Sequence, residues 1–263
     1  MVVVFALLGW LAGIGINLLA DCLPILRRVK GIHCRACGAP LKPAQISALM
    51  TVLFERRRCA YCGVERSKRS WAVEAAAMGV YILLYLFMPD TATLFSSVII
   101  LTLYGLIAVI DIEHRLILHM VSLPSIVIIA LLRGFDPAVG WSKTVWGGAA
   151  GLGFMLVFYL AGELFSRWMA RRRGTPLEEV AFGFGDVLLG CAVGLDVGWP
   201  GVVVALFAGI FAAGIYSLVL ILVRILRGEY KAFLAIPYGP FLIFGAVWLD
   251  YGGATLLKML IGD

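Results

Sequence analysis

Residues 93–111 read TLFSSVIILTLYGLIAVID, an apolar stretch with no charged residue before its last position. As an α-helix at 1.5 Å per residue, a stretch of this length extends about 28 Å, close to the hydrocarbon thickness of a bilayer. Comparable stretches occur at about 2–20, 71–88, 116–132, 143–166, 183–198, 200–226 and 236–257. The sequence therefore predicts an all-α fold, a polytopic membrane bundle of about eight transmembrane helices.

The composition of the chain supports a location in the membrane. Hydrophobic residues make up 62% of the sequence, charged residues only 14%, and the mean hydropathy is +0.99. These values exclude an ordinary soluble globular domain of this length. We expect a lipid bilayer around the chain and no nucleic-acid partner, and the sequence does not indicate an oligomeric state.

The basic residues are distributed unevenly between the predicted loops. With eight spans, 19 of the 22 Lys and Arg residues fall on one side, and Arg133, Lys143 and Lys258 fall on the other. Lys and Arg collect in cytoplasmic loops, whereas merely solvated loop charges would show no such sidedness. The pattern predicts a multi-pass protein of the bacterial inner membrane with both termini outside the cytoplasm.

The longest polar segment, residues 21–70, contains two CxxC pairs, each followed by a glycine. The cysteines are Cys34, Cys37, Cys59 and Cys62. This spacing is typical of a zinc ribbon, in which four thiolates surround one ion. Disulfides or a redox-active pair are the alternatives, but the charge pattern places this loop in a reducing compartment. We expect structural zinc in a loop domain at 21–70, between a first transmembrane helix at 1–20 and a membrane domain at 71–263.

Two aspartates are expected at the same side of the membrane. Asp111 ends the predicted third span, and Asp186 opens the sixth in the sequence Gly183-Phe184-Gly185-Asp186. Two carboxyl groups held close together share a proton, so that one activates water and the other polarises a carbonyl group. The glycines of this motif, Gly183 and Gly185, would let an extended substrate backbone approach the acid. Taken singly, each aspartate is also compatible with an ordinary helix-end residue.

Four features together resemble the bacterial type IV prepilin leader peptidases, a family of GxGD-type intramembrane aspartic proteases. The likeness covers nearly the whole chain. The features are, in order, GIGIN at 13–17 with Leu23-Pro24, the double CxxC loop closing on SWAVE at 70–74, the aspartate pair, and PYGPFLIFGA at 237–246. The resemblance implies that Asp111 and Asp186 are the catalytic acids.

The chain departs from the family pattern at two positions. Members often have a proline several residues after the first aspartate, whereas this chain has Leu118-His119-Met120 there and Pro124 only later. Members also often have a lysine two residues after the second aspartate, where this chain has Leu188. These differences concern the surroundings of the acids and leave the aspartates themselves in place.

The resemblance implies an aspartic endopeptidase that cuts the short basic leader of type IV prepilins or type II secretion pseudopilins on the cytoplasmic face. Glu113, with Glu178 and Glu179, would lie on that side and could steer a basic leader, although the last two are equally typical of a solvated loop. Many members also methylate the new N-terminus with S-adenosylmethionine. The chain has no Gly-rich strand-to-helix turn that would indicate this cofactor independently.

Two alternatives remain at the level of sequence. Another GxGD protease, of the presenilin or signal-peptide-peptidase type, shares only the second motif and has Tyr-Asp where this chain has Ile110-Asp111. An ion- or proton-coupled transporter would use Asp111 and Asp186 to bind protons or cations, and inverted hydropathy repeats would favour it. Such repeats are not evident.

Overall fold

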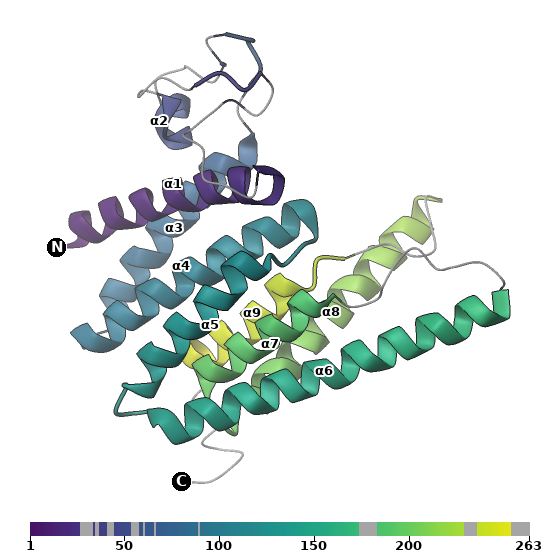
Figure 1. Ribbon diagram of the computed structural model, residues 1–263. Helices are drawn as coiled ribbons and strands as arrows, with labels where there is room; N and C mark the ends of the chain where they lie inside the picture. Colours follow the sequence, from purple (N-terminus) through teal and green to yellow (C-terminus); the bar gives the residue numbers. More distant parts are fainter. Residues whose placement is uncertain are drawn as a thin grey trace. The chain divides into compact units, whose positions relative to one another are not determined.

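The part of the protein that the structure describes is mostly helical and contains no sheet. The computed structural model describes residues 1–26, 34, 37–40, 45–53, 58–59, 61–65, 67–88, 90–173, 183–228 and 236–253 (Figure 1). The helices are α1 (Val2–Leu26), α2 (Ala48–Leu53), α3 (Lys68–Phe87), α4 (Thr91–His114), α5 (His119–Gly134), α6 (Gly140–Arg173), α7 (Phe184–Val197), α8 (Gly201–Leu226) and α9 (Gly239–Trp248), which continues as the π-helical turn η2 (Leu249–Gly253). The predicted all-α membrane fold is confirmed.

Among the residues that the structure describes, five helices are long and apolar enough to cross a membrane: α1, α3, α4, α6 and α8. The other three predicted spans fall on α5, α7 and α9, which have 16, 14 and 10 residues. At 1.5 Å per residue these helices are shorter than a hydrocarbon core about 30 Å thick. The total of eight spans therefore stays a prediction.

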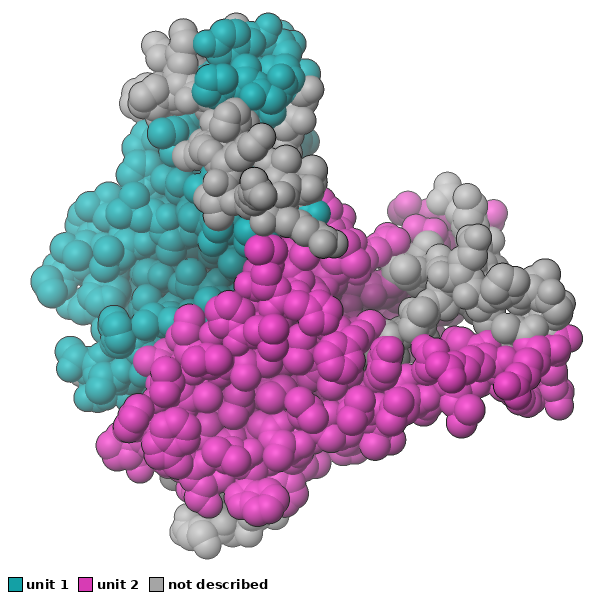
Figure 2. Space-filling view, in the orientation of Figure 1, with its two compact units in different colours: residues 1–109 teal, residues 110–263 magenta. Residues whose placement is uncertain are grey.

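The chain divides into two compact units, residues 1–109 and residues 110–263 (Figure 2). The boundary lies inside α4, so that most of this helix belongs to unit 1 while its last turn, with Asp111, belongs to unit 2. The predicted division at residues 20 and 70 stays a prediction. In unit 1, α1 extends through Pro24 to Leu26, beyond the predicted end at residue 20.

In unit 1, small residues let α1 and α3 approach closely. A Cβ atom at Gly9 would lie 2.6 Å from the carbonyl oxygen of Ala77, and one at Gly13 would lie 2.7 Å from Cα of Glu74. The two glycines are four residues apart and thus lie on one face of α1. Close contact of this kind is a main source of helix association in membranes.

Glu74, on α3, is fully buried and connects three helices of unit 1. Its carboxylate accepts hydrogen bonds from the Trp10 and Asn17 side chains of α1 and from the Ser47 hydroxyl. It also accepts from the backbone N–H groups of Ala48 and Leu49, at 2.8 and 3.0 Å. These N–H groups belong to the first turn of α2 and have no partner within the helix. Glu74 therefore attaches the polar loop to the membrane helices.

In unit 2, α7 is the central helix and packs against α5, α6, α8 and α9. Glycines make its contact with α6 possible. A Cβ atom at Gly147 would lie 2.2 Å from the Gly194 carbonyl oxygen, and one at Gly151 would lie 2.2 Å from that of Gly190. Each helix thus contributes a pair of glycines four residues apart, the small-xxx-small pattern of membrane helix contacts.

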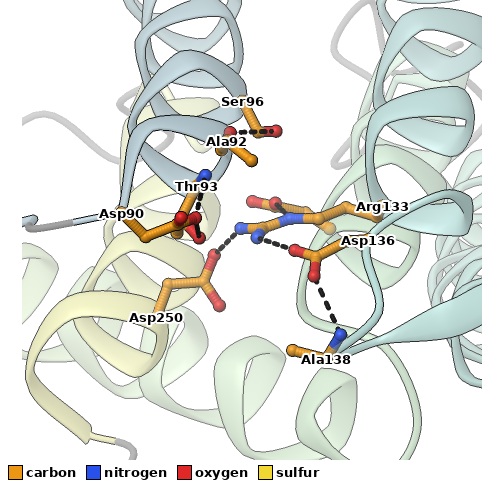
Figure 3. Close-up of polar contacts among 9 residues, drawn as sticks. Asp90, Ala92, Thr93, Ser96, Arg133, Asp136, Ala138 and Asp250 are labelled. Atoms are coloured by element: carbon orange, nitrogen blue, oxygen red, sulfur yellow. Dashed lines mark hydrogen bonds and ion pairs between the residues drawn. The ribbon is translucent and has the colours of Figure 1, made fainter.

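Arg133, on the last turn of α5, holds a buried ion cluster in unit 2. Its guanidinium donates to Asp196 at 2.8 Å and to Asp250 at 2.5 Å, and it lies 3.7 Å from Asp136 (Figure 3). Asp196 belongs to the last turn of α7 and Asp250 to η2. The cluster therefore fixes the ends of three elements against one another, opposite to the end of α7 that carries Asp186.

Candidate active site and metal centre

The four predicted metal ligands come together in unit 1. The Sγ atoms of Cys34, Cys37, Cys59 and Cys62 all lie within 4.8 Å of one another. Cys34 and Cys62 are 3.7 Å apart, and Cys37 and Cys59 are 3.8 Å apart. Four sulfur atoms placed tetrahedrally at 2.3 Å from one ion are about 3.8 Å apart. The cysteine cluster therefore has the geometry of a four-thiolate metal site.

The two CxxC pairs form matching turns. Gly38 donates to the Cys34 carbonyl at 2.9 Å, and Gly63 donates to the Cys59 carbonyl at 3.0 Å. Both glycines have positive φ, 69° and 70°, which other residues rarely adopt. Backbone N–H groups of Tyr61 and Cys62 lower the pKa of the Cys59 thiol to about 6, whereas desolvation and the neighbouring cysteines raise the pKa of Cys62 to about 12. The two glycines therefore complete the turns that hold each cysteine pair.

Asp111 lies on the last turn of α4, where the apolar stretch ends, and only 4% of it is exposed. Its Oδ2 atom accepts a hydrogen bond of 2.8 Å from the backbone N–H of Gly239, the first residue of α9. The first N–H groups of a helix have no acceptor within that helix, and Pro240, the second residue of α9, has no N–H group of its own. The N-terminus of α9 therefore binds the Asp111 carboxylate.

Asp186 occupies the first turn of α7, and its Oδ2 atom accepts a hydrogen bond of 3.0 Å from the backbone N–H of Gly183. This is half of a capping box, in which an acidic third residue binds the N-cap backbone. Asp111 and Asp186 thus both belong to unit 2, and a backbone N–H at a helix end binds each of them.

The two glycines of the GFGD motif have different surroundings. A Cβ atom at Gly183 would lie 3.7 Å from Oδ2 of Asp186, an ordinary van der Waals contact, so the described neighbours do not require a glycine there. A Cβ atom at Gly185 would lie 2.6 Å from Cβ of Ile117, so packing alone requires a glycine there. Contact of either glycine with a substrate stays a prediction. Glu113 is half-buried beside His114, 3.8 Å away, while Glu178 and Glu179 lie outside the described residues.

Sequence reasoning did not single out the residues of the PYGP segment as neighbours of the acids. The backbone N–H of Gly239 binds Asp111. The PYGP motif is visible in the sequence, but its position in the chain does not predict which aspartate it binds. At the departures from the family pattern, Leu188 is buried in α7 and Pro124 lies inside α5.

Membrane-length helices and two carboxyl groups at helix ends of one unit are characteristic of a membrane-embedded aspartic peptidase. The sequence model of the type IV leader peptidase family matches residues 98–218, and that of the bacterial peptidase A24 N-terminal domain matches residues 7–88. The chain belongs to the type IV leader peptidase family. It is a peptidase of the multi-pass inner-membrane kind, and the transporter alternative is not favoured.

Similar proteins with curated names support the same assignment. The prepilin leader peptidase/N-methyltransferase of Bacillus subtilis is 22% identical over 87% of this chain and 84% of its own length. Proteins of the same name from Aeromonas salmonicida and Burkholderia pseudomallei are 28% and 27% identical, over 83% and 87% of this chain and 70% and 69% of their own lengths. No solved structure matches the chain.

Proposed function

We propose that this protein removes the basic leader peptide of a type IV prepilin or type II secretion pseudopilin, with Asp111 and Asp186 as the catalytic pair. The observation that carries the proposal is the position of the two carboxyl groups in one unit, at the last turn of α4 and the first turn of α7, where the backbone N–H groups of Gly239 and Gly183 bind them. The relatives named as prepilin leader peptidases supply the class of substrate.

The chemistry requires one ionised and one protonated carboxyl group. The carboxylate takes a proton from water as the water oxygen adds to the scissile carbonyl carbon, and the carboxylic acid gives its proton to the carbonyl oxygen. The carbon–nitrogen bond then breaks. The leaving nitrogen takes the proton gained by the first group, and a hydroxyl proton returns to the second. Backbone N–H groups of Gly239 and Gly183 hold the two side chains in place for these steps.

The substrate would approach from the cytoplasm. The charge pattern places the ends of α4 and α7 that carry Asp111 and Asp186 on the side rich in Lys and Arg. Gly183 is exposed and has no side chain, so a peptide backbone could approach Asp186 beside it. Glu113, two residues after Asp111, adds negative charge that attracts a basic leader. This orientation places both termini outside the cytoplasm.

Zinc is the metal that best fits the cysteine cluster. Four thiolates at tetrahedral separations are a closed structural site, which leaves no position for water or substrate. Cys34, Cys37, Cys59 and Cys62 would hold the ion, which cross-links a loop too small to be stabilised by a hydrophobic core. Its role is therefore to maintain the loop that Glu74 attaches to α1 and α3.

A second activity, methylation of the new N-terminus, is proposed on the names of the relatives alone. The described residues offer no recognisable cradle for S-adenosylmethionine, and we derive no step through it. Incubation of purified protein with labelled S-adenosylmethionine and a cleaved pilin peptide tests this activity. Transfer of label to the peptide supports it, and cleavage without transfer contradicts it.

Cleavage of a purified prepilin in detergent tests the proposed peptidase directly. We expect Asp111→Asn and Asp186→Asn each to abolish cleavage while the protein remains folded. Asp90→Asn is the matched control, because Asp90 caps the first turn of α4 in unit 1 and asparagine caps helices equally well. Cleavage at the parent rate by either of the first two variants contradicts the proposed function.

A further inference from the structure

The first turn of α7 packs against residues 117–119, where α5 begins. The ring of Phe184 stacks on the ring of His119, with centroids 5.8 Å apart and the two planes 11° from parallel. Aromatic rings at this separation attract one another in an offset stack. One residue further on, a Cβ atom at Gly185 would lie 2.6 Å from Cβ of Ile117, so the backbone of α7 lies close to the same segment. Two successive residues of the GFGD motif thus contact the start of α5.

This segment follows Asp111 closely in the chain. The backbone N–H of Arg115 donates to the Asp111 carbonyl oxygen at 2.8 Å and closes the last turn of α4. Arg115 has a φ of 52°, a left-handed conformation that is uncommon for a residue with a side chain and that turns the backbone out of the helix. The Leu118 carbonyl oxygen accepts the first hydrogen bonds of α5, at 2.9 Å. The link from Asp111 to His119 is therefore short and fixed at both ends.

Phe184 and Asp186 belong to one helical turn. They are the first and third residues of α7, and the Asp186 carboxylate accepts a hydrogen bond of 3.0 Å from the N–H of Gly183, which precedes Phe184. The ring of Tyr159, on α6, meets the Phe184 ring edge-on, with centroids 5.9 Å apart. The Phe184 ring is therefore held from both α5 and α6, and its position determines where the turn that carries Asp186 lies.

We propose that His119 is a positioning residue of the peptidase, whose ring holds Phe184 and thereby fixes the Asp186 carboxylate relative to Asp111. This inference rests on the proposed function of the two aspartates. Each acid lies at a helix end, and the short link together with the stacked rings connects these two ends. The proton transfers require both carboxyl groups at defined places around one substrate carbonyl group, and a displacement of about 1 Å slows such a reaction about 100-fold.

This role predicts a specific kinetic signature. His119→Ala should lower kcat by about 10-fold, because one contact that holds the turn is lost while that of Gly185 with Ile117 remains. KM should change little, since the ring acts on Asp186 and not on the substrate. His119→Phe should keep the parent kcat, because phenylalanine stacks on Phe184 without either ring nitrogen. This rescue distinguishes stacking from a role of the imidazole as a proton donor or acceptor.

Met120→Ala is the matched control. Met120 is the next residue of α5 and is exposed, as His119 is, but a rotation of about 100° per residue points its side chain in another direction. We expect parent kinetics for this variant. A double-mutant cycle with Phe184→Ala gives a second measurement. Because both side chains act through one contact, adding His119→Ala to Phe184→Ala should lower kcat further by less than about twofold.

Cleavage of a prepilin by the parent protein and these variants, with Asp111→Asn and Asp186→Asn beside them, separates the two hypotheses. If both aspartate variants are inactive and His119→Ala has the parent kcat, the role of His119 is refuted while the proposed function stands. Activity in an aspartate variant refutes the proposed function.

Three further outcomes refute the role of His119: a rise in KM alone, a His119→Phe variant as slow as His119→Ala, and fully additive effects of His119→Ala and Phe184→Ala. Since His119 is exposed, the melting temperature of His119→Ala in detergent should stay close to that of the parent protein. If this variant does not fold, His119→Gln is used, which keeps a side chain of similar length without a ring, and parent kcat there refutes the inference.

Discussion

The backbone N–H of Gly239 donates a hydrogen bond to Oδ2 of Asp111 at 2.8 Å, and a Cβ atom at Gly239 would lie 2.8 Å from the same oxygen. The contact therefore depends on a residue without a side chain. It also determines where one of the two acids is held, because Asp111 is almost fully buried and this N–H fixes one of its oxygens.

Gly239→Ala should displace the Asp111 carboxylate and lower kcat by about 100-fold, the effect expected for a shift of about 1 Å in a reacting group. Cleavage kinetics with a prepilin substrate measure this effect. Gly214→Ala on α8 is the control, because a Cβ atom there meets nothing within 4 Å. Equal rates for the two variants would show that the Gly239 contact does not position Asp111.

The contact between α6 and α7 offers a test with a matched pair on one helix. A Cβ atom at Gly151 would lie 2.2 Å from the Gly190 carbonyl oxygen, whereas one at Gly153 meets nothing within 4 Å. We expect Gly151→Ala to lower the free energy of unfolding by about 1–3 kcal/mol, the usual cost of overpacking. Gly153→Ala should change it by less than about 1 kcal/mol.

Equilibrium unfolding of both variants by SDS in mixed micelles provides the measurement. Since α7 carries Asp186, cleavage by Gly151→Ala should fall together with its stability. Identical unfolding curves for the two variants would mean that α6 and α7 can separate at Gly151 without cost, contrary to their contact in the structure.

The fold class could be predicted because apolar composition along a stretch such as 93–111 is a local property of the sequence. The predicted span at 183–198 agrees with α7 to one residue at each end, whereas the length of α9 could not be predicted, since apolar residues continue past its end. The backbone of α9 changes to π-helical hydrogen bonding at Leu249, a change that hydropathy does not record.

The candidate site could be predicted in part for a similar reason. CxxC and GxGD motifs indicate chemistry through residue type and spacing, and they led to the cysteine cluster and to the two acids. In the sequence, Glu74 could be recognised only as the last residue of the SWAVE motif at 70–74. Its partners are Trp10, Asn17, Ser47 and two backbone N–H groups, and their scattered positions form no pattern.

Glu74→Gln should weaken the attachment of α2 to the membrane helices. Glutamine keeps one acceptor oxygen and replaces the other by an NH₂ donor. Either the N–H of Ala48, which binds Oε1, or the Ser47 hydroxyl and the N–H of Leu49, which bind Oε2, then lose their acceptor. Each such loss costs about 1–3 kcal/mol. Hydrogen exchange at Ala48 and Leu49 should accelerate. Glu65→Gln, at an exposed pair with Arg58, is the control and should leave exchange unchanged. Equally slow exchange in all three proteins would contradict the anchoring role.

Loss of one cysteine of the cluster should release the metal. We expect Cys34→Ser and Cys59→Ser to bind less than one zinc per chain and to unfold at lower temperature, because the ion stabilises the loop. Cys191→Ser, on α7 and outside the cluster, should retain one zinc per chain. Metal analysis of purified protein provides the measurement, and equal zinc content in all four proteins would refute the metal centre.

The Arg133 cluster predicts the largest loss of stability. Arg133→Met leaves the carboxylates of Asp196 and Asp250 buried without their partner, and removing one member of a buried pair costs about 3–5 kcal/mol. Arg133→Lys should recover only part of this loss, since an ammonium group lacks the planar fork that reaches both carboxylates.

Arg167→Met is the matched control, because Arg167 pairs with Glu163 on the exposed part of α6, where an ion pair contributes about 0.5 kcal/mol or less. SDS unfolding of the three variants gives the comparison. The triple variant with Arg133→Met, Asp196→Asn and Asp250→Asn should be more stable than Arg133→Met alone, because the uncompensated charges are gone. A triple variant as unstable as Arg133→Met would show that Arg133 acts through its packing and not through its charge.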